Sequence, residues 1–348
     1  MSTTMRGWVL TRHGGPEALR FEELPVPTPG PGRLLVRVTA AALNNTDIWT
    51  RTGAYGLPGD PEARAGWRGA IDFPRVQGGD AAGVVERVGP GVDPALVGRR
   101  VLVDPAFYQD DAPEAHPVGL LGSEADGTFA EYVLVRAERA HDVHTSPLTD
   151  EELACLPVAY GTATGMLERA AVGAGETVLV TGASGGVGLA LVQLATARGA
   201  RVVAVTSAAK AQTVRDAGAV AVIDRAGGAE AVARQAPEEL DAVADVTAGE
   251  LVPALLPRLR EGGRWVVAGA VAGPVVTLDL RRLYLRNIAL LGSSMHTPAH
   301  FARLAEDARR GLVRPVVAAR FPLPQLPAAQ EEFLHHGHAG KIVLVPST

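Results

Sequence analysis

The stretch that decides the fold is ETVLVTGASGGVGLALVQLATARG, residues 176–199. A short apolar run typical of a buried strand ends at the glycine-rich turn TGASGGVG (181–188), and apolar residues then recur at helical spacing. Glycines three residues apart allow a tight turn, a close approach of the backbone to a pyrophosphate, and close packing of helix on strand. The free N–H groups at the start of the helix favour an anion. The turn is therefore predicted to bind a dinucleotide through Gly182, Ser184, Gly185, Gly186, Val187 and Gly188.

The alternation of predicted strands and helices continues along the chain after this turn. A helix is predicted over 208–218, and further strands are predicted over 201–207, 219–225, 241–247, 264–270 and 287–294. Strands and helices that alternate every 20 to 25 residues indicate a parallel sheet with helices on both faces. Six strands in this order predict a complete doubly wound Rossmann domain, which we assign to residues 156–294.

The end of the second predicted strand favours one of two cofactors. A site for NAD usually places Asp or Glu there to bind the ribose hydroxyls, whereas this chain has Ser207 and Lys210 and no carboxylate before Asp216. A hydroxyl and a lysine suit the additional phosphate of NADP. Arg225, at the end of the third strand, is predicted to add positive charge or to stack on adenine. NADP(H) is the predicted cofactor, with Lys210 as an ordinary solvated helix residue the alternative.

The flanking segments have a different pattern. Short strands are predicted over 34–43, 81–89 and 99–105, while 56–70 and 107–126 are predicted to be surface excursions. After the Rossmann segment come a helix (300–311), a strand (316–323), a second helix (327–336) and a last strand (341–346). This tail is too short to fold alone, so residues 295–348 are expected to complete a first domain formed by residues 1–155.

Composition excludes several classes of function. Of the 348 residues 47% are hydrophobic and 20% are charged, and the net charge is -5, which argues against binding to nucleic acid or to an anionic membrane. Neither a membrane-spanning apolar run nor a signal peptide is evident, so we expect a cytoplasmic protein. The single cysteine, Cys155, excludes an intrachain disulfide and a zinc site with several thiolates.

Motifs along almost the whole chain resemble the medium-chain dehydrogenase/reductase superfamily, especially its quinone oxidoreductase branch. They are GPEALRFEELPVPTPGPGRLLVRVTAAALNNTD (15–47), QGGDAAGVVERVGPGV (77–92), GTFAEYVLV (127–135), the 181–188 turn and GKIVLVP (340–346). The resemblance implies an α/β fold with a GroES-like β-barrel catalytic domain, a Rossmann domain and a cleft between the two. It also implies a small-molecule substrate and, commonly, a homodimer.

The chain departs from the zinc-containing members of this superfamily at the metal ligands. At the positions that match their three catalytic ligands stand Asn44, Gly79 and Val158, none of which offers a thiolate or an imidazole. The lobe that matches their structural zinc site contains no cysteine. We predict no metal site, and the alternative is a metal tract formed by the histidine groups His335, His336 and His338 or His141 and His144.

The resemblance also indicates residues that act on the substrate. Asn44 matches an asparagine that donates to a cofactor or substrate oxygen, Thr46 matches a hydroxyl that relays protons, and Tyr55 is predicted to line the pocket and donate a proton. Asp47 is interpreted as structural. The cofactor is further predicted to contact residues at the domain junction and at the ends of the fourth and fifth strands: Thr162, Val246, Gly269 and Ala270. For Lys341, contact with the cofactor and a role in the fold both stay open.

These observations predict a zinc-independent, NADPH-dependent reductase that transfers a hydride to a quinone or to an activated C=C bond of the enone type. Two alternatives remain. One is an alcohol/carbonyl oxidoreductase, which would lack an electrophile for the alkoxide. The other is a non-catalytic NADPH-binding protein with a regulatory or structural role.

Overall fold

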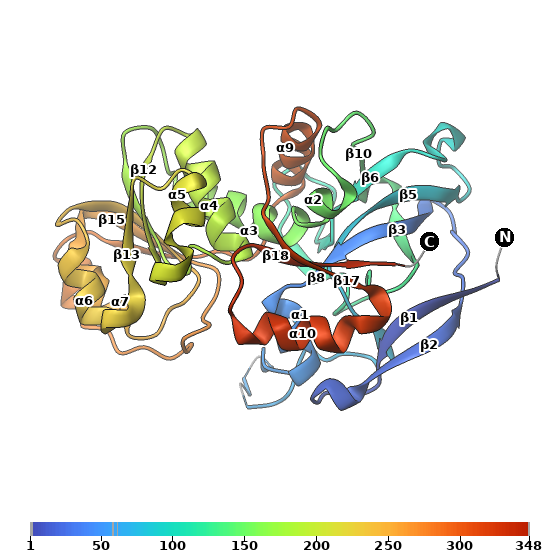
Figure 1. The fold of residues 1–348 in the computed structure, drawn as a ribbon, viewed down its shortest axis with the longest axis horizontal. Coiled ribbons are helices and arrows are strands. Elements are labelled where there is room, and N and C mark those ends of the chain that lie inside the picture. Colours follow the sequence, from blue (N-terminus) through green and yellow to red (C-terminus); the bar gives the residue numbers. More distant parts are fainter. Residues whose placement is uncertain (1–2, 58, 61, 347–348) are drawn as a thin grey trace. The chain divides into compact units, whose positions relative to one another are not determined.

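A parallel sheet of six strands organises the middle of the chain (Figure 1). The computed structural model describes residues 3–57, 59–60 and 62–346, and the chain divides into two compact units, Met1–Val158 with Thr297–Thr348, and Ala159–His296. The sheet of the second unit has the order β13-β12-β11-β14-β15-β16. Its strands are β11 (Thr177–Val180), β12 (Arg201–Thr206), β13 (Ala221–Asp224), β14 (Leu240–Asp245), β15 (Leu259–Val267) and β16 (Ala289–Gly292).

This order is that of a doubly wound dinucleotide fold, so the predicted Rossmann domain is confirmed. The strands connect through helices that cover the sheet. The connecting helices are α4 (Gly186–Ala197), α5 (Ala211–Asp216), α6 (Gly228–Gln235), α7 (Leu251–Leu255) and α8 (Arg281–Tyr284), while α3 (Pro157–Arg169) precedes β11. Short 3₁₀ turns η4 (Ala208–Lys210), η5 (Arg225–Gly227) and η6 (Leu256–Arg258) join them. Apolar residues such as Val243 and Trp265, which lie opposite each other on β14 and β15, form part of the core of this unit.

The first unit is built mainly from antiparallel strands. A seven-stranded sheet has the order β10-β6-β5-β3-β18-β17, and β9 pairs with β3. A three-stranded sheet (β2-β1-β4) and a two-stranded sheet (β7-β8) complete it. The strands are β1 (Thr4–Leu10), β2 (Leu19–Pro25), β3 (Arg33–Ala42), β4 (Arg75–Val76), β5 (Asp80–Val88), β6 (Arg100–Val103), β7 (Ala106–Tyr108), β8 (Pro117–Leu120), β9 (Tyr132–Arg136), β10 (Ala140–Asp142), β17 (Val317–Pro322) and β18 (Lys341–Val345). This is the expected GroES-like fold.

The helices of the first unit begin where the sequence supplies caps. Thr149 and Glu152 form a capping box at α2, and Thr297 caps α9, whose first residue is Pro298. The helices are α1 (Asn45–Thr52), α2 (Asp150–Ala154), α9 (Pro298–Arg309) and α10 (Leu326–His335), with 3₁₀ turns η1 (Pro16–Ala18), η2 (Pro94–Leu96), η3 (Ala137–Arg139) and η7 (Leu323–Gln325).

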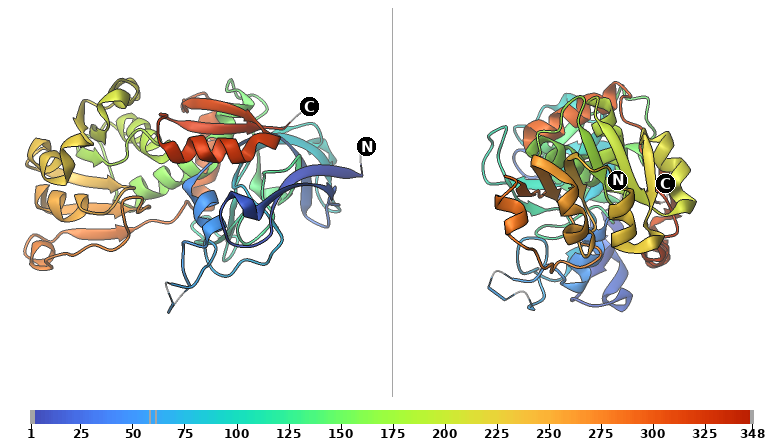
Figure 2. Two further views of the ribbon diagram at one scale, coloured as in Figure 1. Left: turned by 60° about the horizontal axis from the view of Figure 1, so that its bottom comes forward. Right: turned by 90° about the vertical axis from the view of Figure 1, so that its left-hand side faces the viewer.

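The end of the chain returns to the first unit. β18 pairs antiparallel with β3, so that Val343 lies opposite Ala42, and β17 pairs in parallel with β18. Figure 2 shows this red C-terminal segment in the same unit as the blue N-terminal strands. Leu34, Phe129 and Leu344, from three distant parts of the sequence, share one apolar core. This shared core gives the physical reason for the return, because the tail buries its apolar side chains there.

The second predicted excursion is only partly at the surface. It contains β7 and β8, and Leu120, Leu121 and Ser123 are buried. Glu124 accounts for this burial, because its carboxylate accepts backbone N–H groups from Arg68 and Leu120, both at 2.8 Å. The two excursions are also joined by the Trp67 N–H, which donates to Ser123 Oγ at 2.9 Å, and by the Arg68 guanidinium, which donates to the Pro117 carbonyl at 3.0 Å. Periodicity does not reveal these contacts.

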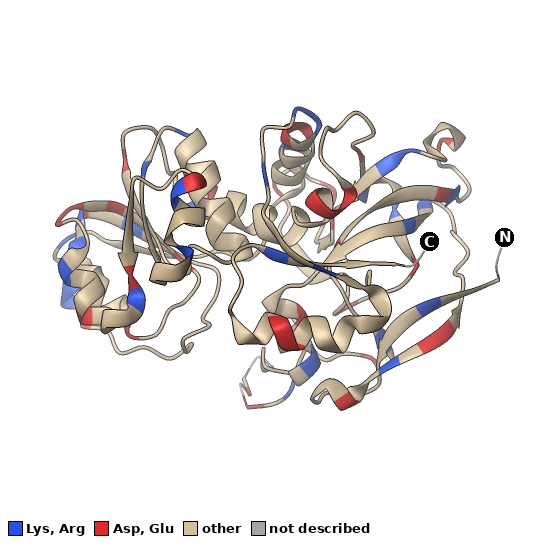
Figure 3. Ribbon diagram, viewed as in Figure 1, with Lys and Arg blue, Asp and Glu red and all other residues tan. Residues whose placement is uncertain are grey.

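Charged residues of both signs are interspersed along the elements of each unit (Figure 3). Among the helices of the described residues, none is long and apolar enough to cross a membrane.

Candidate functional site

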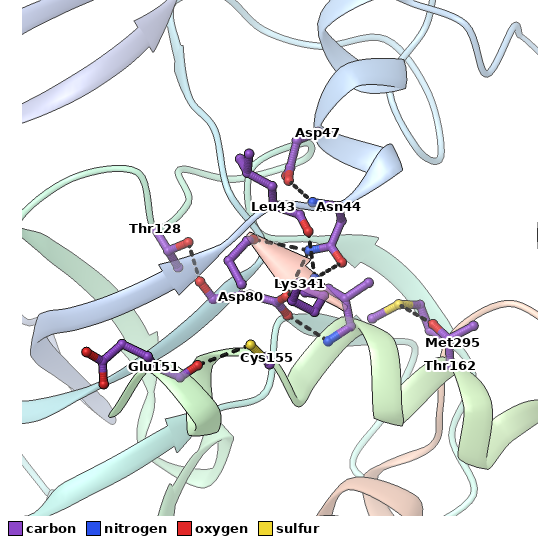
Figure 4. Close-up of polar contacts among 12 residues, drawn as sticks. Leu43, Asn44, Asp47, Asp80, Thr128, Glu151, Cys155, Thr162, Met295 and Lys341 are labelled. Carbon is purple, nitrogen blue, oxygen red and sulfur yellow. Dashed lines mark hydrogen bonds and ion pairs between the residues drawn. The ribbon is translucent and has the colours of Figure 1, made fainter. Parts of the chain in front are cut away.

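A buried polar cluster lies where α1, β5 and β18 meet in the first unit (Figure 4). The Lys341 ammonium donates to Asp80 Oδ2 at 2.8 Å, to the Leu43 carbonyl at 2.7 Å and to Asn44 Oδ1. Asn44 Nδ2 donates to Asp80 Oδ2 at 2.9 Å and to the Ala42 carbonyl at 3.3 Å. Since Lys341 can only donate and Asp80 can only accept, the orientation of the Asn44 amide is determined by chemistry.

Neighbouring side chains hold the backbone of Asn44 and of Asp80 in place. Asn44 precedes the first turn of α1, and its N–H donates to the Asp47 carboxylate at 2.7 Å, which is the reciprocal part of a capping box. The carbonyl of Asp80 accepts from Thr128 Oγ1 at 2.8 Å. Asp80 and Lys341 are 0% and 5% exposed in their side chains, so this ion pair is buried and is matched by further hydrogen bonds.

Burial also changes the protonation of two neighbours. It raises the pKa of Asp47 to about 7, with repulsion from Asp80 adding to the rise and the Asn44 N–H and Lys341 opposing it. Burial likewise raises the pKa of the Cys155 thiol to about 12, so this cysteine is not a thiolate nucleophile at neutral pH. Asp47 fits the structural interpretation made from the sequence.

Asn44, Gly79 and Val158, which the resemblance is predicted to place at zinc-ligand positions, come together around Asp80. Asn44 donates to one of its oxygens, and the Val158 N–H donates to the other at 2.7 Å. Gly79 directly precedes Asp80, and a methyl group placed on Gly79 would lie 3.3 Å from Val158 Cγ2. An amide, a hydrogen atom and an isopropyl group supply neither thiolate nor imidazole, so these residues do not fit a zinc ion. No group of three or more His, Cys, Asp or Glu among the described residues is arranged to hold a metal.

The predicted catalytic residues lie around the start of α1. Tyr55 donates from its hydroxyl to Thr46 Oγ1 at 2.8 Å, and its ring packs edge-on against Trp49. Burial raises the pKa of Tyr55 above its usual value, which keeps the phenol protonated. Both amide hydrogens of Asn44 go to protein acceptors, so its position here is that of a residue that holds Asp80 and Lys341. Donation from Asn44 to a cofactor or substrate oxygen stays a prediction.

The second unit carries the predicted phosphate-binding turn between β11 and α4. Gly182 has a positive φ of 57°, and a methyl group on Gly188 would lie 2.2 Å from the Gly182 carbonyl oxygen. Both positions therefore require glycine. Gly185 is the residue before α4, with Gly186 and Val187 in its first turn. These residues could hold a pyrophosphate at the free N–H groups of a twelve-residue helix.

Two basic residues stand near the ends of adjacent strands. β12 pairs in parallel with β13, so Thr206 lies opposite Asp224, with Ser207 and Arg225 the next residues along. Burial lowers the pKa of Lys210, and repulsion from Arg225 lowers it further. The two cations are thus close enough to repel each other, an arrangement that an anion would stabilise.

The remaining predicted cofactor residues follow β14 and β15 at the carboxyl edge of the sheet. Val246, Gly269 and Ala270 are half-buried there. Thr162, on α3, is buried, and its hydroxyl lies 3.7 Å from the sulfur of Met295. In open parallel sheets ligands bind outside this edge.

Sequence reasoning did not identify Asp80 as the residue around which the polar cluster forms. The sequence GGD (78–80) offered a signal for this role. Asp80 directly follows Gly79, the position matched to a zinc ligand, and an acid there can orient neighbouring groups. Lys341, whose role the sequence left open, belongs to the same cluster through its ion pair with Asp80.

Comparison with known proteins gives the same two-unit arrangement. The family model described as "Alcohol dehydrogenase GroES-like domain" matches residues 30–145, and the one described as "Zinc-binding dehydrogenase" matches residues 186–309. A GroES-like unit joined to a Rossmann unit defines a class of dehydrogenases and reductases. The chain belongs to the medium-chain dehydrogenase/reductase superfamily and is an oxidoreductase, which confirms the resemblance seen in the sequence.

Curated relatives span nearly the whole chain but differ in their reactions. An alcohol dehydrogenase of Schizosaccharomyces pombe is 30% identical over 97% of this chain and 96% of its own length. An acryloyl-coenzyme A reductase of Metallosphaera sedula is 30% identical over 95% of this chain and 97% of its own length. A quinone oxidoreductase of Mus musculus is 28% identical over 98% of both chains.

Solved structures agree with this assignment. The structure of a protein from Sinorhizobium meliloti, described as a putative alcohol dehydrogenase, is 46% identical, with a TM-score of 0.94 over 100% of this chain and 98% of that one. A thermostable alcohol dehydrogenase from Pyrobaculum aerophilum, solved with cobalt and zinc, is 31% identical, with a TM-score of 0.85 over 99% of this chain and 100% of that one.

Proposed function

We propose that this protein is a zinc-independent, NADPH-dependent reductase that transfers a hydride to a quinone or to an activated C=C bond. The observation that carries the proposal is the cluster around Asp80, where Asn44, Gly79 and Val158 stand at the zinc-ligand positions. Without thiolate or imidazole there, a carbonyl would have no metal to polarise it. A conjugated acceptor needs less polarisation, because its electron-poor carbon takes a hydride directly and leaves an enolate or hydroquinone. The relatives named quinone oxidoreductase and acryloyl-coenzyme A reductase support this choice.

The Rossmann unit would bind the dinucleotide. The reduced nicotinamide, when bound, supplies the hydride. The turn at Gly182–Gly188 would hold the pyrophosphate, and Ser207, Lys210 and Arg225 would hold the additional phosphate of NADPH. Small residues at Gly269 and Ala270 would let the cofactor approach the backbone, with Val246 and Thr162 as further contacts.

The first unit would supply the proton that completes the reduction. The Tyr55 hydroxyl donates to Thr46 Oγ1 at 2.8 Å, so a proton that leaves the Thr46 hydroxyl can be replaced from Tyr55. Asn44 would hold this end of α1 in position through Asp80 and Lys341.

The alternative reaction is reversible oxidation of an alcohol, favoured by the relative from Schizosaccharomyces pombe. The two reactions differ in what stabilises the oxyanion. An alkoxide is far more basic than an enolate or a hydroquinone anion, so it depends more strongly on an electrophile such as zinc.

The experiment titrates the purified protein with NADPH and NADH by fluorescence, then follows oxidation of the reduced cofactor with quinones, enones and carbonyls. Each reaction is repeated after treatment with a chelator, and the zinc content is measured by mass spectrometry. We expect tighter binding of NADPH, turnover of quinones or enones, and rates unaffected by the chelator. Chelator-sensitive turnover of alcohols and carbonyls alone would replace this function with the alternative. If neither dinucleotide binds, the proposal is wrong.

We also propose that the protein is a homodimer, as is common in the superfamily. β16 is an edge strand of its sheet. The exposed large apolar residues of the preceding segment and of this strand are Val271, Val275, Leu280, Tyr284, Leu285 and Leu290. Apolar side chains exposed beside an unpaired strand edge favour association with a second copy.

A further inference from the structure

Asp245 ends β14 with a fully buried carboxylate. Its Oδ1 atom accepts from Thr181 Oγ1 at 2.5 Å, from the Thr247 N–H at 2.9 Å and from the Ala248 N–H at 3.0 Å. Its Oδ2 atom accepts from Trp265 Nε1 at 3.2 Å. A buried carboxylate with this many donors is fully satisfied, and it joins three neighbouring strands of the sheet.

The turn that follows Asp245 has a conformation that the chain does not favour by itself. Ala248 has a positive φ of 55°, which is unfavourable for a residue with a side chain, and Gly249 follows at 62°. The Thr247 and Ala248 N–H groups point to Asp245 instead of entering a strand or helix ladder. The carboxylate therefore compensates for the backbone conformation of residues 246–249.

Thr181 connects this turn to the phosphate-binding turn. Its hydroxyl donates to Asp245 and accepts from the Val246 N–H at 3.1 Å. Thr181 is the first residue of TGASGGVG and is fully buried. The Thr181 hydroxyl thus sets the position of Val246 relative to the start of the phosphate-binding turn.

Val246 in turn lies against two glycines of the carboxyl edge. A methyl group on Gly182 would lie 2.9 Å from Val246 Cγ2, and one on Gly269 would lie 3.0 Å from the Val246 carbonyl oxygen. At such separations, a shift of Val246 by a few tenths of an ångström changes the space beside both glycines.

We propose that Asp245, acting through Thr181 and Val246, is a positioning residue that sets the distance between the phosphate-binding turn and the ends of β14 and β15. Because this inference deepens the proposed function, it depends on the dinucleotide binding at this edge. The cofactor would contact residues on both sides of the connection, so its affinity should depend on a carboxylate and a hydroxyl that lie beneath the binding surface.

The test compares Thr181→Val, which removes the hydroxyl and keeps the shape, with Thr181→Ser, which keeps the hydroxyl. Asp245→Asn is the second disruptive variant. We expect Thr181→Val and Asp245→Asn to raise the Kd and the KM for NADPH about tenfold, since each leaves buried donors or acceptors unmatched. Thr181→Ser should stay within about twofold of the wild type, and kcat at saturating NADPH should change by less than about threefold in all variants.

A purely structural role would give a different pattern. Thr181→Val and Asp245→Asn would then lower the Tm of the cofactor-free protein and leave the Kd for NADPH unchanged, which would overturn the inference. Loss of affinity in Thr181→Ser equal to that in Thr181→Val would also overturn it, because the hydroxyl would not be the cause. Should Thr181→Val fail to fold, the same comparison is made between Asp245→Asn and Thr181→Ser. Failure of the wild type to bind NADPH or NADH would instead refute the proposed function itself, and this inference with it.

Discussion

At the scale of single residues, the chemistry of this protein depends on what each polar group faces. Asn44 would be a free donor if it lay on an open loop, but between Lys341 and Asp80 its oxygen and both its hydrogens are engaged. Lys341 stands between a carboxylate, an amide oxygen and a carbonyl, and the Asp80 carboxylate neutralises its charge. The type of a residue determines which hydrogen bonds it can make, and its neighbours in the fold determine which of them it does make.

We expect the choice of cofactor to depend on Lys210. Lys210→Ala removes one of the two cations that repel each other near the ends of β12 and β13. We expect the Kd for NADPH to rise about tenfold or more, because a charge-assisted contact with phosphate is lost, while the Kd for NADH stays within about twofold. Fluorescence titration with both dinucleotides measures this. Arg215→Ala, the same charge change on the exposed face of α5, is the control. Equal losses for both dinucleotides would contradict a role in recognising the phosphate.

Asp47 should make the stability of the protein depend on pH. Its pKa is raised from 3.8 to about 7 in the folded protein, so the folded state binds this proton more tightly than the unfolded chain. The stabilisation of the folded protein by this proton is complete below pH 3.8, the pKa of Asp47 in the unfolded chain, and is lost as the pH rises through about 7. Asp47→Asn cannot ionise and keeps an oxygen for the Asn44 N–H. Between pH 5 and pH 8 the Tm of the wild type should fall relative to this variant by roughly 3–6 °C. A difference in Tm between the wild type and Asp47→Asn that stays constant from pH 5 to pH 8 would show that the pKa of Asp47 is not raised.

At the scale of elements, most of the proposed cofactor contacts lie in turns and at strand ends. The turn between β11 and α4 and the turn after β14 are short segments in which left-handed residues, among them Gly182 and Ala248, aim N–H groups at chosen acceptors. The two excursions of the first unit are organised in the same way by Glu124, which accepts from Arg68, Leu120 and Ser123. In both units a side-chain or backbone acceptor thus organises a short segment that lies outside the main sheets.

Glu124→Gln tests this role. The substitution places an NH₂ group against donors that a carboxylate oxygen accepted, so at least one N–H loses its partner. We expect the Tm to fall by about 3–6 °C and hydrogen exchange to accelerate at the amides of Arg68 and Leu120. Glu62→Gln, at an exposed position of the first excursion, should leave both unchanged. Unchanged exchange in Glu124→Gln would mean that the other contacts between the excursions, such as the hydrogen bond from the Trp67 N–H to Ser123 Oγ, hold the lobe.

At the scale of the whole molecule, the chain separates two tasks between two units. The Rossmann unit has a parallel sheet whose carboxyl edge is the proposed cofactor site, and the GroES-like unit has a buried ion pair between Asp80 and Lys341. The edge strand β16 and its exposed apolar neighbours give the Rossmann unit a second surface, which we assign to a copy of the same chain.

Leu290→Lys should disrupt this dimer. Leu290 is 43% exposed on β16, and a lysine there would place a charge in an apolar interface. Light scattering after gel filtration should give two chains of 36.1 kDa for the wild type and one for the variant. Val97→Lys, at a residue that is 50% exposed in the first unit, should remain dimeric. A monomeric wild type would refute the dimer, and a dimeric Leu290→Lys would place the interface elsewhere.

The sequence by itself determined the Rossmann fold, the succession of its strands along the chain and the glycines of the turn between β11 and α4. Apolar runs, helical periodicity and glycine spacing are local signals, and a parallel sheet repeats them six times. The return of β18 to β3 followed from the shortness of the tail, but its register with Ala42 did not.

Only the tertiary structure decided which polar groups meet. Asn44, Asp80, Val158 and Lys341 span almost 300 positions, and Asp245 reaches Thr181 across 64. Their partnerships depend on strand register and on buried hydrogen bonds between distant segments, which leave no periodic trace in the sequence. For this reason the sequence did not reveal that the Asn44 amide donates to Asp80 and to the Ala42 carbonyl, and its donation to a cofactor or substrate oxygen stays a prediction.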